Sequence, residues 1–339
     1  MGRGISITSE AGSHGALARG SSLYNFQKFK SLEKLHKFDH KLQVQFLRFQ
    51  HQYINIENLQ CHIHGQYAIF MSRNIFLKRV TVLDTETTNL HADIAEIVEL
   101  AGARYNGQTW EVSSQLFGAT NGIPPEASAK NNISNRMIAD LPKFMQSIEQ
   151  VDEILHTSDT SYYVAHNCQY DQTVLSKSWQ EAGCSNLAKI AADTQRWICT
   201  YRLAQQLMEV NFADMQYNLS YLRYKLDLPV EDNTVAHRAG DDTLVCAVLF
   251  EFLVDFALAN NYVTDGPDLG EQLHHLCWQP ILYQTWPFGK NKGSDFSEIP
   301  TDYYLWALKT LDALNEEKPD FNFDLSESVR VELERRLEE

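Results

Sequence analysis

Two acids, Asp84 and Glu86, stand one residue apart at the end of the apolar run at residues 80–83. Side chains two positions apart on a strand face the same side, so the two carboxylates are predicted to converge on one point. Carboxylates that share a site repel each other, and one of them takes up a proton unless a cation lies between them. A divalent cation with oxygen ligands resolves this repulsion, so the pair predicts a metal site. The alternative is that both acids mark the exposed end of a strand.

A second stretch, YVAHNCQYD, could bring another acid to the same place. A buried strand is predicted to end at His166 and Asn167, and a helix begins near Asp171. Taken alone, Asp171 is explained by the favourable effect of an acid at a helix N-terminus. His166 and Asn167 are equally explained as loop residues that form hydrogen bonds.

A third stretch, VAHRAGDD, contains His237 and Asp242 five positions apart. Inside one helix these positions differ by about 140° around the axis. The two side chains can therefore meet only if His237 lies in the loop before the helix and Asp242 in its first turns. A histidine there could act as a general base near neutral pH, although taken alone His237 is explained as a surface residue. The neighbouring Asp241 is expected to face solvent.

The elements that must position these residues follow from the hydrophobic pattern. Short apolar runs bounded by turn residues predict strands at residues 79–84, 97–105, 109–117 and 161–167. Helical periodicity predicts helices at residues 141–155, 170–183, 200–210, 217–226 and 241–261. Strands that alternate with helices after an opening meander are typical of an α/β layered domain.

The charge of the chain is unevenly distributed. Residues 1–80 contain 11 basic and 4 acidic residues, a charge of +7, so the remainder of a chain with net charge −15 carries −22. Such an acidic body argues against nucleic acid as a partner, unless divalent metal ions supply the positive charge. The six cysteines show no zinc-binding spacing and are predicted to be reduced thiols. Without an 18-residue apolar stretch or a secretory signal, we expect no membrane contact and a cytoplasmic location.

Three domains are predicted. Residues 1–78 form an N-terminal extension, either poorly ordered or an artefact of the assigned gene start, with Met71 as the natural first residue. Residues 79–262 form the α/β domain. Residues 263–339 form a small helical module with one helix through 271–277, a turn-rich segment WPFGKNKG, and two amphipathic helices.

Taken together, the three stretches resemble the three motifs of the DEDDh, or DnaQ-like, 3′→5′ exonucleases, over residues 79–258. The resemblance implies an α/β ribonuclease H-like fold, a mixed sheet flanked by helices. It also implies that four acids hold two Mg²⁺ ions, for which Mn²⁺ can substitute, and that one histidine activates water; these are Asp84, Glu86, Asp171, Asp242 and His237. The stretch IPPEASAKNNIS resembles the family's linker, but residues 131–134 depart from its usual H-G-I-T.

Within this superfamily, WICTYRLAQQL, YNLSYLRYKLDL and the tail WPFGKNKG with IPTDYYLWAL resemble exodeoxyribonucleases of the X type. The resemblance implies that residues around the first and second motifs bind the terminal nucleotide: the backbone amides of Thr87, Thr88 and Asn89, Leu90 as a wedge against the base, and His166 and Asn167. Tail residues suited to stacking and phosphate contact are Trp286, Phe288, Lys290 and Lys292. The alternative is a packed module with solvated lysines.

The main hypothesis is a 3′→5′ exodeoxyribonuclease that releases 5′-mononucleotides from single-stranded and duplex DNA 3′ ends during repair. One alternative is an RNA-trimming exoribonuclease of the same fold, which differs in its tolerance of the 2′-hydroxyl group. Another, from a different class, is a catalytically silent nucleic-acid-binding subunit that accompanies a polymerase.

Overall fold

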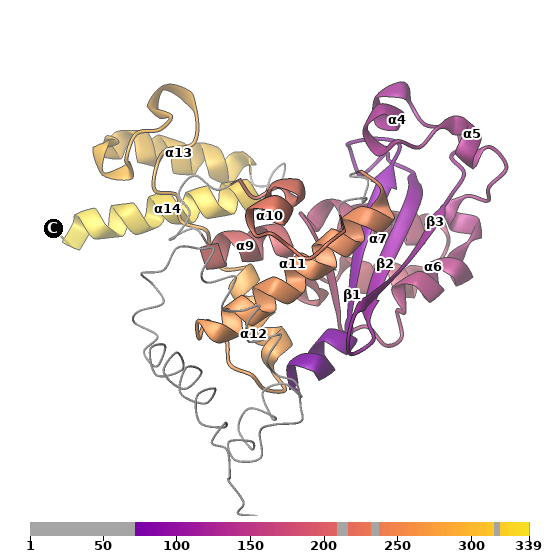
Figure 1. The fold of residues 1–339 in the computed structure, drawn as a ribbon. Helices are drawn as coiled ribbons and strands as arrows, with labels where there is room; N and C mark the ends of the chain where they lie inside the picture. The colour runs from indigo at the N-terminus through magenta and orange to yellow at the C-terminus, as the bar shows by residue number, and fades with distance from the viewer. Residues whose placement is uncertain (1–71, 209–215, 232–236, 315–318, 339) are drawn as a thin grey trace, which may run out of the picture. The chain divides into compact units, whose positions relative to one another are not determined.

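The computed structural model describes residues 72–208, 216–231, 237–314 and 319–338. Its centre is one mixed sheet of five strands in the order β3-β2-β1-β4-β5 (Figure 1). β1 pairs antiparallel with β2, β2 pairs antiparallel with β3, and β4 and β5 continue the sheet parallel to β1. The strands are β1 (Val80–Thr87), β2 (Ile97–Tyr105), β3 (Trp110–Leu116), β4 (Tyr162–Ala165) and β5 (Trp197–Cys199). This architecture confirms the predicted α/β fold class; the sequence predicted four strands and missed β5.

Helices cover both faces of the sheet. The long helix α11 (Ala239–Ala259) packs across β1, β2 and β3, and the main-chain N–H of Ala239 bonds to Glu99 on β2. Gly102 on β2 faces the other side, where a Cβ atom would lie 2.6 Å from the main-chain oxygen of Ile154 in α6 (Ile148–Leu155). Because alternate residues of a strand face opposite sides, α11 and α6 lie on opposite faces. Glycine at position 102 allows α6 to approach this closely.

The remaining helices connect and extend these layers. They are α4 (Pro125–Asn131), α5 (Asn135–Ile138), α7 (Gln169–Glu181), α8 (Ser185–Ala192), α9 (Thr200–Met208), α10 (Leu219–Lys225), α12 (Leu269–Cys277), α13 (Thr301–Leu314) and α14 (Pro319–Glu338). The helices predicted at 170–183, 200–210, 217–226 and 241–261 correspond to α7, α9, α10 and α11. No helix among the described residues combines the length and apolar character that crossing a bilayer requires.

The segment just before the predicted domain start at residue 79 contacts α11. Residues 72–78 form a helix whose Arg73 binds Glu251 at 2.7 Å and Asp255 at 2.7 Å, both on α11, while Phe76 and Leu77 are buried. These contacts join the segment to the domain. Residues 1–71, on which the rest of the N-terminal prediction falls, lie outside the described residues.

The first helix of the C-terminal module predicted to start at residue 263 packs against the α/β domain. Helix α12 packs against α9 and β5, and its Cys277 accepts a hydrogen bond from the main-chain N–H of Cys199 at 3.2 Å. It therefore belongs with the sheet. A separate core begins at Trp286; the buried residues of this core are Trp286, Phe296, Ile299, Tyr304, Ala307, Leu325 and Val329.

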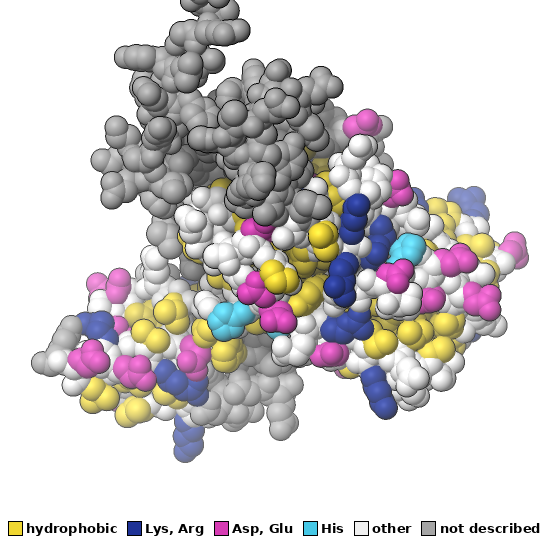
Figure 2. Space-filling view, turned by 90° about the horizontal axis from the view of Figure 1, so that it is seen from below, with side chains coloured by type: hydrophobic (Ala, Val, Ile, Leu, Met, Phe, Trp, Pro, Cys, Tyr) yellow, Lys and Arg dark blue, Asp and Glu magenta, His cyan; other side chains and the backbone are white. Residues whose placement is uncertain are grey.

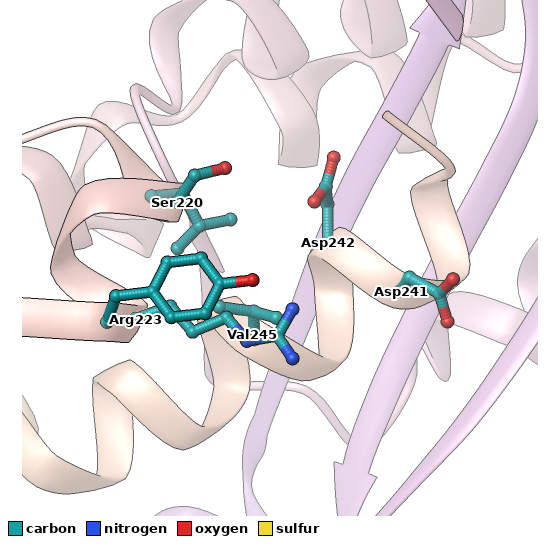
Figure 3. Close-up of a pocket in the computed structure, with 7 residues that line it drawn as sticks. Ser220, Arg223, Asp241, Asp242 and Val245 are labelled. Atoms are coloured by element: carbon teal, nitrogen blue, oxygen red, sulfur yellow. The ribbon is translucent and has the colours of Figure 1, made fainter. Parts of the chain in front are cut away.

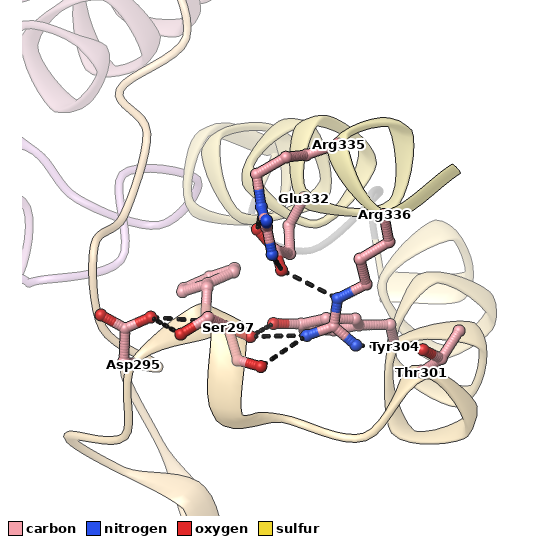
Figure 4. Close-up of polar contacts among 8 residues, drawn as sticks. Asp295, Ser297, Thr301, Tyr304, Glu332, Arg335 and Arg336 are labelled. Carbon is pink, nitrogen blue, oxygen red and sulfur yellow. Dashed lines mark hydrogen bonds and ion pairs between the residues drawn. The ribbon is translucent and has the colours of Figure 1, made fainter. Parts of the chain in front are cut away.

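A network of arginines and one acid holds α14 against the segment before α13 (Figure 4). Glu332 accepts hydrogen bonds from Arg335 and Arg336 at 2.8 Å each. Arg336 also donates to the main-chain oxygens of Phe296 and Ser297 and lies over the ring of Tyr304. These cationic hydrogen bonds lower the pKa of Glu332 to about 2. The acid is fully compensated and serves the packing of the module.

One buried ion pair joins the module to the α/β domain. Arg202 on α9 binds Asp324 on α14 through two hydrogen bonds of 2.8 and 3.0 Å, and each side chain is only 7% exposed. Asp324 also accepts the main-chain N–H of Ile281 at 2.9 Å, and Arg202 donates to the main-chain oxygen of Cys277. A bidentate pair with further hydrogen bonds on both partners fixes orientation as well as attraction.

Candidate active site

Three of the predicted acids meet at the C-terminal end of β1. Asp84 and Glu86 point to the face that α11 covers, and Asp242 lies in the first turn of that helix. Each offers one carboxylate oxygen, and these oxygens all lie within 4.8 Å of one another. The structure thus brings together residues 158 positions apart in the sequence, as a shared site requires.

The fourth acid, Asp171, lies beside this group and is more deeply buried. Its side chain is 4% exposed, and Thr85 Oγ1 donates to its Oδ1 at 2.7 Å. Among neighbouring charges, Asp171 contributes most to the raised pKa of Asp84. Burial raises the pKa of Asp171 itself to about 7, against the effect of the Thr85 hydrogen bond. The four acids therefore come from the end of β1 and the first turns of α7 and α11.

The electrostatics of the cluster favour a cation. Burial raises the pKa of Asp84 well above its usual range, and the negative charges of Asp171 and Glu86 raise it further. Burial, Asp242 and Glu99 raise the pKa of Glu86 to about 7, although Lys130 opposes this shift. Like charges at short range in a partly desolvated site disfavour ionisation. A positive ion would reverse each of these effects.

His237 occupies the position that the spacing predicted, in the loop before α11. It has a left-handed backbone conformation with φ of 65°, its side chain is exposed, and its main-chain N–H donates to Asp242 Oδ2 at 2.9 Å. Burial raises the pKa of Asp242, and this hydrogen bond lowers it. The loop conformation therefore holds the histidine and the acid together through the backbone, leaving the imidazole ring accessible.

A pocket of about 110 Å³ adjoins Asp242 (Figure 3). It is lined by Leu219, Ser220, Arg223, Tyr224, Asp241, Asp242 and Val245. Figure 3 shows the Asp241 and Asp242 carboxylates pointing in different directions from the same helical turn. Only Asp242 belongs to the group of converging acids. Asp241 lines the pocket and is only partly exposed, so it does not face solvent fully as expected.

An ion pair that the sequence did not reveal fixes the start of α11. Glu99 on β2 is 2% exposed and lies opposite Glu86 in the β1–β2 pairing. It binds Arg238 through two hydrogen bonds of 3.1 and 2.9 Å and accepts the main-chain N–H of Ala239. Arg238 directly follows His237. The only sequence signal of this pair is that Glu99 lies inside the apolar run IVELAGARY. Its partner, Arg238, can be identified only from the tertiary structure.

The loop that follows β1 presents two exposed apolar side chains. Leu90 is 78% exposed and Ile94 is 65% exposed. The loop is closed by Thr88, whose main-chain N–H donates to Glu96 O and whose Oγ1 accepts the Glu96 N–H, both at 3.0 Å. The Thr88 amide, which is predicted to hold a nucleotide, is thus bonded to Glu96 in this structure. Leu90 keeps its predicted role as a proposal, and Ile94 was missed.

His166 and Asn167 are loop-formers. His166 Nδ1 lies 2.9 Å from Thr200 Oγ1 and Nε2 lies 2.9 Å from the main-chain oxygen of Tyr217, so both ring nitrogens are used. Burial lowers the pKa of His166 to about 4, which keeps the ring neutral. Asn167 is exposed and adopts a φ of 64°. The predicted nucleotide contact of His166 is thus not available, because its nitrogens are committed to the protein.

In the C-terminal module, Trp286 is fully buried, so the predicted stacking of this ring on DNA is wrong. Phe288 packs against the same core. Lys290 and Lys292 are exposed, and Lys290 Nζ lies 5.2 Å from the centre of the Tyr303 ring. The packed-module alternative therefore holds for the aromatic residues.

Figure 2 shows the underside of the view in Figure 1, where basic side chains gather in a row among acidic and apolar ones. The negative balance of residues 81–339 is thus not spread evenly over the surface.

Comparison with known proteins gives a consistent family. Residues 81–250, half of the chain, match the model of the RNase_T exonuclease family. Exodeoxyribonuclease 10 of Escherichia coli strain K12 is 29% identical over 240 residues, covering 70% of this chain and 93% of the relative. DNA polymerase III subunit epsilon of Treponema pallidum is 28% identical over 176 residues, covering 51% and 75% respectively. A structure of exonuclease X in complex with 5′ overhanging duplex DNA is 26% identical, covers 58% of this chain and 99% of that chain, and has a TM-score of 0.42. The protein belongs to the RNase_T exonuclease family, as a DnaQ-like 3′→5′ exonuclease of nucleic acids.

Proposed function

We propose that the protein is a metal-dependent 3′→5′ exodeoxyribonuclease that releases 5′-mononucleotides from DNA 3′ ends and acts in DNA repair. The observation that carries this proposal is the convergence of Asp84, Glu86 and Asp242 beside the exposed apolar loop that presents Leu90. Acids alone could hold an ion. Acids next to an exposed apolar surface suit a substrate that combines phosphate with a base.

The acids fit divalent cations on chemical grounds. Asp84, Glu86 and Asp242 supply converging carboxylate oxygens, and Asp171 supplies a fourth acid close to Asp84. Hard oxygen donors prefer Mg²⁺ and Mn²⁺, so we propose two Mg²⁺ ions as the natural complement. Bound cations would lower the pKa of the attacking water and stabilise the negative charge on the leaving 3′ oxygen.

The residues of the chain supply the remaining functions. We propose His237 as the general base, because its exposed side chain lies two residues before α11 and its main-chain N–H is hydrogen-bonded to Asp242. Arg238 and Glu99 hold this loop against β2. Leu90 and Ile94 would contact the terminal base, and Lys130 offers a positive charge near Glu86 for a phosphate.

DNA is proposed as the substrate because the relative named Exodeoxyribonuclease 10 is matched over 93% of its length. The test compares 5′-labelled single-stranded, blunt and overhanging DNA with RNA of the same sequence, using wild type and Asp84→Ala. We expect metal-dependent shortening of the DNA from its 3′ end by wild type only, with 5′-mononucleotides as products. Faster shortening of RNA than of DNA would replace the DNA proposal with the RNA-trimming alternative.

A further inference from the structure

Tyr170 directly precedes Asp171 on α7, and its hydroxyl group reaches the loop after β1. This hydroxyl donates to the main-chain oxygen of Asn89 and lies 2.5 Å from Thr87 Oγ1. Thr87 Oγ1 itself lies 2.9 Å from the same Asn89 oxygen. Two hydroxyl groups therefore surround one carbonyl. Either hydroxyl group can donate to the carbonyl while the other donates to the first hydroxyl group. The carbonyl therefore has a donor in both arrangements.

The orientation of this carbonyl fixes the next amide. No peptide bond among the described residues is cis, and in a planar trans peptide the N–H of residue 90 points opposite to the C=O of residue 89. Because Asn89 O points at Tyr170 on α7, the Leu90 N–H points away from α7. Within the described part of the chain, nothing accepts a hydrogen bond from that N–H. Tyr170 and Thr87 thus orient this amide and the start of the Leu90 side chain, which is 78% exposed.

The far end of the loop is held by the same helix. Lys177 Nζ donates to the main-chain oxygen of Ala95 at 2.6 Å. Lys177 follows Tyr170 by seven residues, which places both on one side of α7. Between them the loop is braced by the Asn89 side chain, whose Oδ1 accepts the His91 N–H at 2.9 Å. One helix therefore carries Asp171 and holds the loop at both ends, so the spacing between acids and loop is set by a single rigid element.

We propose that Tyr170 is a positioning residue that sets Leu90 and the Leu90 amide at the distance from the acids that a 3′-terminal nucleotide requires. This inference rests on the proposed function, since it concerns the nucleotide that the site receives. Tyr170 does not touch the reacting phosphate. Without its hydroxyl group, the peptide between residues 89 and 90 gains rotational freedom, and part of the binding energy of the terminal nucleotide is spent on ordering it.

The test uses Tyr170→Phe, which keeps the ring and removes only the hydroxyl group. Two substrates separate positioning from chemistry: a short single-stranded DNA, which places a base on the loop, and bis(p-nitrophenyl) phosphate, which has neither base nor sugar. Losing the contact to one carbonyl is expected to raise KM for the DNA by about fivefold to tenfold, with kcat/KM for the small ester within about twofold. Thr87→Val should raise the same KM, and the double variant should raise it further than either single change, because each single variant leaves one hydroxyl group that can donate to the carbonyl.

Tyr262→Phe is the matched control, because Tyr262 is 44% exposed and lies outside the site; it should change neither reaction. An equal fall in activity on both substrates would overturn the inference, because Tyr170 would then act through Asp171. If Tyr170→Phe had the same KM for DNA as wild type, the inference would also be overturned. The proposed function would still stand as long as wild type shortens DNA. Wild type that fails to shorten DNA would instead remove the proposed function itself.

Discussion

Acidic side chains serve opposite purposes in two regions of this protein. At the end of β1, Asp84 and Glu86 have raised pKa values because burial and neighbouring acids disfavour their charge. In the C-terminal module, hydrogen bonds from Arg335 and Arg336 lower the pKa of Glu332 to about 2 (Figure 4). The first arrangement opposes folding until a cation arrives, and the second stabilises the fold by itself. Whether a buried acidic side chain stabilises the fold thus depends on its partners and not on its burial alone.

The largest effect should come from removing an acid of the first kind. Asp84→Asn keeps the shape of the side chain and removes a central charge of the cluster. We expect its rate of nucleotide release to fall by about 10³-fold or more at saturating Mg²⁺. Asp241→Asn, one position from the converging Asp242, is the matched control and should retain activity. Loss of activity in Asp241→Asn with retention in Asp242→Asn would reverse the assignment of these two acids.

Breaking the Arg202–Asp324 ion pair between the α/β domain and the C-terminal module should cause a large loss of stability. Arg202→Met leaves Asp324 buried without its cation, so we expect the free energy of unfolding to fall by about 3–5 kcal/mol. Urea unfolding followed by tryptophan fluorescence would measure it. Replacing both partners, as Arg202→Met with Asp324→Leu, should restore most of the loss. If the double variant were as unstable as the single one, the pair would matter through its other hydrogen bonds.

The acid cluster predicts a smaller effect of opposite sign. Without metal, Asp84→Asn relieves repulsion among the acids, so its melting temperature should exceed that of wild type by about 2–4 °C, the change that 1 kcal/mol produces in a domain of this size. Adding Mg²⁺ should raise the melting temperature of wild type and have little effect on Asp84→Asn. Differential scanning fluorimetry with EDTA and with Mg²⁺ measures both. A variant less stable than wild type in EDTA would mean that the acids do not strain the metal-free fold.

The smallest effect is expected at Glu332, whose ion-pair partner Arg335 is 45% exposed. Glu332→Gln should lower the free energy of unfolding by about 0.5–1 kcal/mol at neutral pH and leave exonuclease activity unchanged. The pKa of Glu332 is lower in the folded protein than its usual value of 4.5. Its contribution is therefore complete above that value and disappears as the pH falls toward about 2. Unfolding curves from pH 7 to about pH 2 should show the two proteins converge at the acid end.

The sequence was most informative where local pattern and chemistry coincide. Asp84 and Glu86 follow from strand alternation, and the placement of His237 before α11 follows from helical geometry. β5 was missed because three residues are too few for a visible alternation. The partnership of Glu99 with Arg238 was missed because strand register and helix docking bring together residues that are 139 positions apart.

The errors in the C-terminal module have a related cause. Trp286 was predicted to meet DNA because aromatic and basic residues adjoin it in the sequence. Its ring is instead covered by Tyr304 and Leu325, which come from helices further along the chain. Composition can suggest a binding surface, but which face of a segment is covered depends on elements that the segment does not contain.

The attachment of residues 72–78 to α11 offers a position for a fluorophore or a surface tether. Arg73 forms an ion pair with Asp255, which follows Asp242 by thirteen residues on α11. This separation corresponds to about 20 Å along the helix. A fluorophore or surface tether fused ahead of residue 72 would therefore join the domain at the end of α11 remote from the acids. Such a handle would allow single molecules to be immobilised with their catalytic end free.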